Sequence, residues 1–259
     1  ETGRYAVTEV ATRVGYDIGD LVRIPTAKSA IVGRRLADLV DDERRVAEAA
    51  AVLGFDARYD IVAAVAALPV ERVIDAAAGL ARRQLIEPPA DDMIRFVHDK
   101  LAEAARDALD APGAPDTPGA PGAGRAASLH RAAAAALEAA YAADVGEVAA
   151  ALALHHERGG NAKDAARYFA LAGDRERTLY ALKEAERHYD RAVGVLERLG
   201  DVERAAKTLL KLALVHTAAF EPAAMQASYR RAFALWDELR AAMTSHKQRL
   251  LRVGQHRPE

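Results

Sequence analysis

Apolar residues recur at three- and four-residue spacing through the first part of the chain, which is the pattern of amphipathic helices. The pattern predicts helices over residues 25–40, 43–53, 56–68 and 69–87. Pro25 suits the first turn of the first helix, and Gly54 suits the end of the second. We therefore expect the chain to open with a group of helices.

The pattern changes after this group. Residues 84–89 and 92–99 resemble two short strands around a turn, with Ile94 and Phe96 alternating with polar residues. Another helix is predicted from Lys100 to Leu109. Three helices followed by a small hairpin is the order of a winged helix, so residues 1–110 are predicted to form a winged-helix domain in which the hairpin is the wing.

A segment rich in proline and glycine, Ala111–Gly124, cannot continue a helix and is predicted to be a linker. Beyond it the helical pattern resumes, over residues 125–141, 145–160, 161–174, 175–201, 202–220 and 222–243. Short connections force neighbouring helices to run antiparallel. The prediction is an all-α fold, with a helical array at 125–243 and a C-terminal tail or the start of a further domain at 244–259.

Small and aromatic residues alternate within this array at similar spacing. The copies are Ala165, Phe169 and Ala172; then Ala185, Tyr189 and Ala192; and, with only the last two positions kept, Met225, Tyr229 and Ala232. Small residues let helices approach while the aromatic ring fills the space between them, as in tetratricopeptide (TPR) repeats. The copies are separated by 20 and then 40 residues, so we expect degenerate TPR-like repeats.

Composition agrees with packed helices. Hydrophobic residues make up 51% of the chain and aromatics 5%, and alanine, the best helix former, dominates. The absence of cysteine excludes disulfides and thiolate metal sites. No signal peptide and no apolar run of membrane-spanning length is visible. We therefore expect a cytoplasmic location without membrane contact and, because the chain begins with Glu1, a piece of a longer protein.

Charge is unevenly distributed. The formal net charge is -2, and residues 1–110 alone carry a net charge of -5. Nucleic-acid binders present basic patches, so nucleic acid is not an expected partner of this segment. DNA binding by the winged helix, with Arg82 and Arg83 touching phosphates, remains the alternative function.

The motifs of nucleotide-binding and catalytic sites are missing. The chain has neither G-x-x-x-x-G-K-[ST] nor G-x-G-x-x-G, and no catalytic constellation is evident, so no enzyme activity is predicted. His155 and His156 point about 100° apart on a helix, so one is expected to face a neighbouring helix and the other water, without binding a metal. The aromatic residues of the array are expected to be mainly core: Tyr168, Tyr180, Tyr189, Tyr229 and Trp236.

Residues from Pro25 to about Trp236 resemble the region that follows the nucleotide-binding module of STAND ATPases, the signal-transduction ATPases with numerous domains. The resemblance runs through "IPTAKSAIVGRRLADLVDDERRVAEAAAVLGF", "VIDAAAGLARRQLIE", "IRFVHDKLAEAA" and "LALHHERGGNAKDAARYFALAGDRE". It implies that this chain is a regulatory part of a larger protein that uses ATP or ADP, whereas no cofactor is expected in this chain. The Pro/Gly-rich Ala111–Gly124 departs from the short joint usual in the family.

The resemblance also suggests a role for the pair His98 and Asp99. By it, His98 would face the β-phosphate of ADP held by an upstream nucleotide-binding domain, and Asp99 would hold the local turn. The alternative left open is that His98 caps the hairpin and makes hydrogen bonds within its own domain.

At the C-terminal end of the sequence, "LRVGQHRPE", Leu251–Glu259, resembles the opening strand of oligopeptide-binding solute receptors.

The function expected from these observations is a non-catalytic signalling module. Its winged helix would sense ADP in the longer protein, and its repeats would bind a protein or small-molecule inducer. The alternatives are the DNA-binding regulator and a plain helical scaffold linked to a C-terminal oligopeptide-binding domain.

Overall fold

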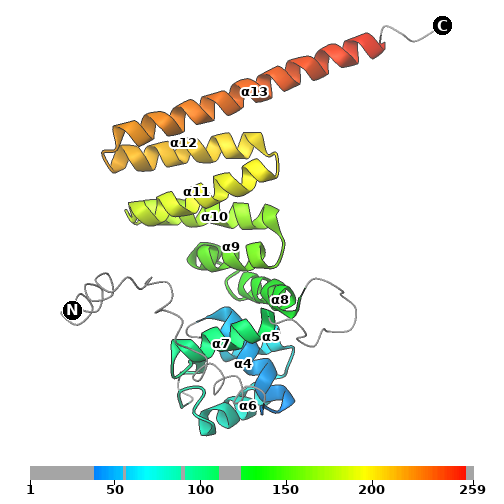
Figure 1. Ribbon diagram of the computed structural model, residues 1–259, viewed down its shortest axis with the longest axis vertical. Helices are drawn as coiled ribbons and strands as arrows, with labels where there is room; N and C mark the ends of the chain where they lie inside the picture. Colours follow the sequence, from blue (N-terminus) through cyan, green and yellow to red (C-terminus); the bar gives the residue numbers. More distant parts are fainter. Residues whose placement is uncertain (1–37, 55–56, 89–90, 111–123, 255–259) are drawn as a thin grey trace, which may run out of the picture.

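The computed structural model describes residues 38–54, 57–88, 91–110 and 124–254 (Figure 1). Ten α-helices, one short 3-10 helix and one two-stranded sheet make up this part of the chain, which confirms the all-α prediction. Most of the predicted helix at 25–40 and nearly all of the predicted linker at 111–124 lie outside the described residues. Within those residues, no helix is both long enough and apolar enough to cross a membrane.

The first part of the fold is a compact group of helices with a small sheet (Figure 1). Its elements are α4 (Asp41–Leu53), β1 (Ala57–Arg58), α5 (Tyr59–Ala66), α6 (Val70–Arg82), β2 (Met93–Ile94) and α7 (Asp99–Asp110). Alanines fill the buried face of α4, and their small side chains let α5 and α6 pack closely against it.

The hairpin prediction is only partly correct. Ile86 and Phe96 form an isolated antiparallel bridge, flanked by a 2.8 Å hydrogen bond from Glu87 N to Arg95 O. The strand Met93–Ile94, however, pairs with Ala57–Arg58, a segment that was predicted to be helical. Helix α5 therefore begins at Tyr59, because sheet pairing outweighs the helical pattern of these two residues.

A buried carboxylate lies where α4 meets α6. Glu43 accepts hydrogen bonds from Val40 N at 3.3 Å and pairs with Arg83 Nε at 3.1 Å. Gly79 of α6 leaves room for it, since a Cβ at Gly79 would overlap Glu43 Oε1. The charge of Glu43 is thus satisfied at a crossing that a larger residue would block.

Helix α8 (Arg125–Ala140) connects this group to the rest of the chain. It packs against α4, α5 and α7, and the buried core continues without a break from Leu39 to Ala192. Arg125 reinforces the contact, because its Nε and Nη2 donate to Glu48 Oε2 of α4 at 2.8 and 2.5 Å. The beginning of the helical array is therefore joined to the first group through one hydrophobic core.

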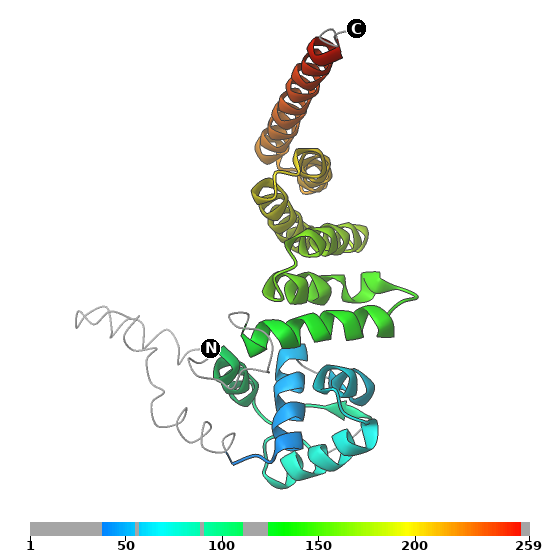
Figure 2. The same ribbon diagram turned by 90° about the vertical axis from the view of Figure 1, so that its right-hand side faces the viewer.

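From α8 the chain rises as a stack of antiparallel helices, the arm (Figures 1 and 2). The arm consists of the 3-10 helix η1 (Val145–Val148), α9 (Ala149–Arg158), α10 (Ala162–Thr178), α11 (Leu182–Arg198), α12 (Val202–Ala218) and α13 (Pro222–Gly254). Each helix packs mainly on the helices before and after it.

The arm has a regular period that was not predicted. Gly160, Tyr180, Gly200 and Phe220 each have a positive φ, between 57° and 83°, and each ends one helix of the stack. These positions are 20 residues apart. The same spacing places Ala205, Leu209 and Leu212, all buried, at the corresponding positions of α12, but Leu212 is large where the other copies have alanine. The spacing of the turns is thus regular, while the residue types at equivalent positions vary.

Two predicted boundaries in the arm are wrong. The helix break expected between residues 174 and 175 lies at Leu179–Ala181, where Ala181 N donates to Glu176 O at 2.9 Å and closes the end of α10. Residues 244–254, predicted as a tail or new domain, continue α13. Leu251–Gly254 are accordingly helical and not the opening strand that the resemblance implied.

Helices α10 and α11 approach each other closely at Gly173. A Cβ built on Gly173 would lie 2.7 Å from Cδ1 and Cε1 of Tyr189. Tyr189 is 0% exposed, and its hydroxyl donates to Asp174 Oδ1 at 2.7 Å. The ring is therefore held against the backbone of α10 at a position that only glycine allows.

Candidate functional site

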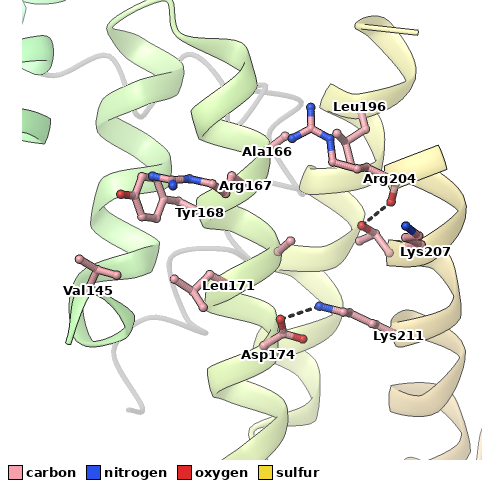
Figure 3. Close-up of a pocket in the computed structure, with 12 residues that line it drawn as sticks. Val145, Ala166, Arg167, Tyr168, Leu171, Asp174, Leu196, Arg204, Lys207 and Lys211 are labelled. Atoms are coloured by element: carbon pink, nitrogen blue, oxygen red, sulfur yellow. Dashed lines mark hydrogen bonds and ion pairs between the residues drawn. The ribbon is translucent and has the colours of Figure 1, made fainter. Parts of the chain in front are cut away.

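A groove of about 410 Å³ lies along one side of the arm, between η1, α10 and α12 (Figure 3). Its floor is apolar and is made by Val145, Ala166, Ala170, Leu171 and Leu196. The floor is continuous with the packed core of the arm, so it is a preformed surface. Apolar grooves with a few polar groups at the edge are the usual form of ligand-binding sites.

The rim of the groove is basic. Four cationic side chains surround it, Arg167 from α10 and Arg204, Lys207 and Lys211 from α12, and Asp174 is the acidic residue of the lining. The side chains that line the groove therefore include more cations than acids, although the net charge of the whole chain is slightly negative. An anionic group with an apolar body is the ligand that this surface suits.

Three of the rim cations have acidic neighbours on their own helix or at its start. Arg204 pairs with Asp201 at 2.6 Å, Lys207 with Glu203 at 2.5 Å, and Arg167 with Asp164 at 3.5 Å. Such exposed pairs, three or four residues apart, contribute about 0–1 kcal/mol each. A ligand carboxylate can thus replace these partners at little cost.

The fourth cation belongs to a more ordered group. Lys211 Nζ lies 2.6 Å from Asp174 Oδ2, while Asp174 Oδ1 accepts the hydrogen bond from Tyr189 (Figure 3). Burial and this hydrogen bond raise the pKa of Tyr189. The tyrosine therefore stays neutral and fixes Asp174, which in turn holds Lys211 against the groove.

Tyr168 forms one end of the site. Its hydroxyl donates to Glu138 Oε1 at 2.6 Å. Its ring lies 4.3 Å from the Arg167 guanidinium and stacks on the His156 ring, with the ring centres 5.3 Å apart. Burial and the hydrogen bond to Glu138 raise the pKa of Tyr168 to about 12. This stacked arrangement orients Arg167 at the edge of the groove.

The residues predicted to sense ADP lie far along the chain from this groove, at the start of α7. His98 is exposed, and its carbonyl accepts a hydrogen bond from Leu101 N at 2.9 Å. Among the described residues its imidazole has no hydrogen-bond or ion-pair partner. Asp99 is exposed at the first position of α7 and lines a hollow between α7 and α8.

The prediction for the adjacent histidines is wrong in one respect, because neither faces water. His155 is buried, and its Nδ1 lies 2.9 Å from Nδ1 of His130 in α8. His156 stacks on Tyr168 and its Nε2 lies 3.2 Å from Glu138 Oε1. Burial, followed by the charges of His130, Arg158 and His156, lowers the pKa of His155 to about 4.

The aromatic residues of the array are not all core. Tyr168 and Tyr189 are buried, as expected, and Tyr229 and Trp236 are partly buried. Tyr180 is 82% exposed because it occupies the turn after α10.

Of the two arginines considered for DNA contact, Arg82 is exposed, whereas Arg83 is paired with the buried Glu43.

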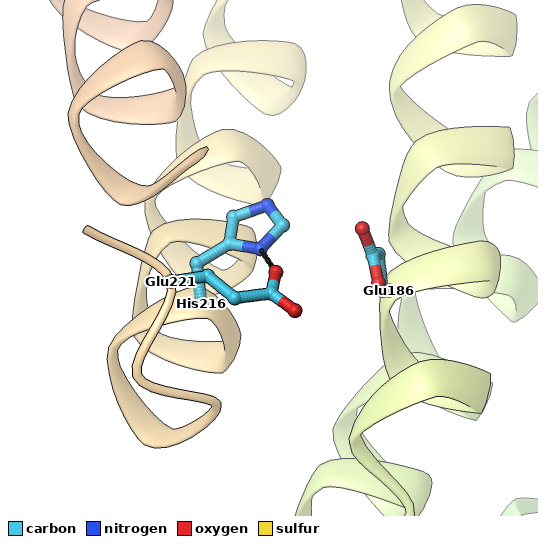
Figure 4. A group of neighbouring side chains, drawn as sticks. All are labelled: Glu186, His216 and Glu221. Atoms are coloured by element: carbon cyan, nitrogen blue, oxygen red, sulfur yellow. Dashed lines mark hydrogen bonds and ion pairs between the residues drawn. The ribbon is translucent and has the colours of Figure 1, made fainter. Parts of the chain in front are cut away.

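Neither the groove nor a cluster of three side chains was predicted from the sequence. The cluster consists of Glu186, His216 and Glu221, which come from three parts of the arm (Figure 4). The 20-residue period was the available signal. It places Arg167, Arg187 and Lys207 at equivalent positions on successive helices, so that two of the three flank one groove. The cluster has no such signal, because its members belong to different repeat positions.

Comparison with known proteins identifies no relative. No protein-family model, no curated protein and no solved structure matches the chain.

Proposed function

We propose that this chain is a non-catalytic interaction module whose arm binds an acidic, partly apolar segment of a protein partner. The observation that carries the proposal is the groove between α10 and α12, with its apolar floor and its four cations. Stacked helical repeats commonly use such extended surfaces for binding. The weak ion pairs of the rim make the cations available to carboxylates of the partner.

The first part of the fold supports the more specific assignment to a STAND-type regulator. Three helices, α4, α5 and α6, precede the Ile86–Phe96 bridge, in the order of a winged helix. The antiparallel helices of the arm that follows support its assignment as a TPR-like array in this proposal. In this proposal the winged helix adjoins an upstream nucleotide-binding domain, and the arm receives the inducer.

The binding proposal is tested with synthetic peptides. A fluorescein-labelled peptide composed of Asp, Glu and Leu is titrated with the protein, and binding is followed by fluorescence anisotropy. We expect at least about tenfold weaker binding of peptides in which the acids are replaced by Lys or the leucines by Ser. Affinity for the acidic peptide should also fall as salt is raised, because exposed charges are screened.

Variants locate the binding surface. Arg204→Gln combined with Lys207→Gln removes two rim charges and should weaken binding of the acidic peptide by about tenfold. Arg187→Gln combined with Arg240→Gln is the matched control, since each of these arginines also pairs with a nearby acid of its own helix but lies outside the groove. Equal loss in both variants, or no loss in the first, would reject the groove as the binding site.

A second proposal concerns His98. Its exposed imidazole, without a partner among the described residues, stands at the first turn of α7 and is free to contact a phosphate. We retain the proposal that it contacts the β-phosphate of ADP in a longer protein that carries a nucleotide-binding domain. A hydrogen bond between a charged group and phosphate contributes about 1.5–3 kcal/mol.

The test uses that longer protein. His98→Ala should weaken ADP binding by at least about tenfold in calorimetric titration, since 1.4 kcal/mol corresponds to a factor of ten. His188→Ala, a change in α11 of the arm, serves as the control. Unchanged ADP affinity together with unchanged basal signalling output would exclude the sensing role of His98.

A further inference from the structure

The cluster Glu186, His216 and Glu221 lies where three elements of the arm meet, apart from the groove. Glu186 is on α11, His216 is in the last turn of α12, and Glu221 immediately precedes α13. One oxygen or nitrogen atom from each residue lies within 4.8 Å of those of the other two. Figure 4 shows Glu186 facing the His216–Glu221 pair from the opposite helix.

His216 is the fixed member of the cluster. His216 is 5% exposed, and its Nδ1 lies 3.3 Å from Glu221 Oε2. Backbone hydrogen bonds also hold the segment, because Glu221 N donates to His216 O at 2.9 Å and Glu221 O accepts from Met225 N at 3.0 Å. The histidine and the glutamate are thus positioned by the turn between α12 and α13, which recurs throughout the arm.

A cation already lies between the two carboxylates. Lys183 Nζ is 3.0 Å from Glu221 Oε1 and 3.3 Å from Glu186 Oε2. This ammonium group, mainly through its hydrogen bond, lowers the pKa of Glu221 below its usual value. The two carboxylates thus favour a positive charge in the space between them.

Lys183 is also the most easily displaced member. Its side chain is 66% exposed and belongs to the first turn of α11, so it can turn into solvent without disturbing the core. With Lys183 displaced, two carboxylates and one imidazole are left within 4.8 Å of one another. Asp190, whose pKa is raised by burial and by Glu186, adds a further acidic group nearby.

We propose that Glu186, His216 and Glu221 form a zinc(II) site that ties α11 and α12 to the start of α13. One nitrogen and two oxygen ligands with a fourth position for water is a donor set that zinc accepts in tetrahedral geometry. Tetrahedral zinc with bonds of about 2.0–2.2 Å separates its donor atoms by roughly 3.5 Å. The donors here lie up to 4.8 Å apart, so they must move together by about 1 Å, which the two glutamate side chains can do by rotation. Lys183 acts as the competing cation.

Binding is measured on the whole chain at pH 7.5, with Zn²⁺ in competition against a chromophoric chelator and with Co²⁺ as a spectroscopic probe. We expect one zinc ion per chain, and a visible absorption band of four-coordinate cobalt that zinc abolishes. His216→Gln and Glu186→Gln should each weaken binding at least about tenfold, because each removes one of three protein ligands. Glu184→Gln, on the same helix and outside the cluster, should leave the affinity unchanged.

Lys183→Met provides a test that does not depend on damaging the site. Removal of the competing ammonium group should tighten zinc binding by about tenfold, the opposite direction from the ligand variants. Circular dichroism of each metal-free variant checks that the arm is still folded. No zinc binding, binding that persists in His216→Gln, or an unchanged or weaker affinity in Lys183→Met would each overturn the proposal.

Discussion

The contact between Gly173 and Tyr189 makes a specific prediction about the stability of the arm. In Gly173→Ala the new methyl carbon would lie 2.7 Å from two ring carbons of Tyr189, about 1 Å closer than ordinary contact. The ring cannot move away freely, because its hydroxyl is bound to Asp174 one residue after the glycine. The substitution therefore either separates α10 from α11 or breaks this hydrogen bond.

The expected magnitude follows from opposing contributions. Alanine favours the helix over glycine by about 1 kcal/mol. Forcing an extra carbon into a packed core costs about 1–3 kcal/mol, and loss of a hydrogen bond to a charged group costs about 1.5–3 kcal/mol. The cost exceeds the gain in helix propensity, and we expect Gly173→Ala to lower the free energy of unfolding by about 0.5–2 kcal/mol.

Gly194, on α11, is the matched control. A Cβ at this position meets only Arg198 Nη1, at 3.7 Å, among the atoms within 4 Å. Gly194→Ala should therefore gain helix stability without a clash and raise the free energy of unfolding by about 0.5–1 kcal/mol. Both variants are compared with the original chain by urea unfolding, followed by circular dichroism and by native-state hydrogen exchange in α10 and α11.

A result in which Gly173→Ala is as stable as Gly194→Ala would refute the argument that the ring prevents any side chain at 173. A double variant tests the cause. In a background of Tyr189→Leu the clash is absent, so Gly173→Ala should cost markedly less than it does beside tyrosine. An equal cost in both backgrounds would show that some other contact is responsible.

Three further predictions concern the turns, the joint and the buried histidine. Tyr180→Gly and Phe220→Gly relieve a positive φ in exposed turn residues and should each raise the free energy of unfolding by about 1 kcal/mol in urea unfolding. Arg125→Ala removes the hydrogen bonds to Glu48, so we expect a loss of about 2 kcal/mol, read as faster hydrogen exchange in α8. Because the pKa of His155 is lowered to about 4, the unfolded chain takes up a proton on this imidazole below about pH 6.5 and the folded protein does not. The free energy of unfolding is therefore unaffected by His155 above pH 6.5 and falls by up to about 3 kcal/mol as the pH is lowered towards 4. His155→Gln should make this fall smaller, as measured by urea unfolding at a series of pH values.

The helices of the arm were predictable because local signals mark them. Apolar spacing, the glycine turn at Gly200 and Pro222 at the start of α13 each identify an element from its own residues. The break at Tyr180 was missed because an aromatic residue in a left-handed turn carries no local signal. Its position is evident only from the period that Gly160 and Gly200 define.

The small sheet and the candidate sites depend on contacts between distant residues. Ala57–Arg58 pair with Met93–Ile94 across more than thirty residues, and nothing in their own sequence distinguishes them from helix. The groove likewise combines Arg167 with Lys207, which become neighbours only when α10 and α12 pack on α11. The nucleotide role of His98, in contrast, rests on resemblance and stays a prediction.

The regular turns of the arm limit how its length can change during evolution. Each helix with its turn takes 20 residues, and consecutive helices point in opposite directions. Loss or gain of a single 20-residue unit would carry the following segment to the opposite side of the stack. Loss or gain of two units would move that segment along the stack but keep the side on which the chain leaves. Length variants that preserve the attachment of a downstream segment should therefore differ by an even number of helices.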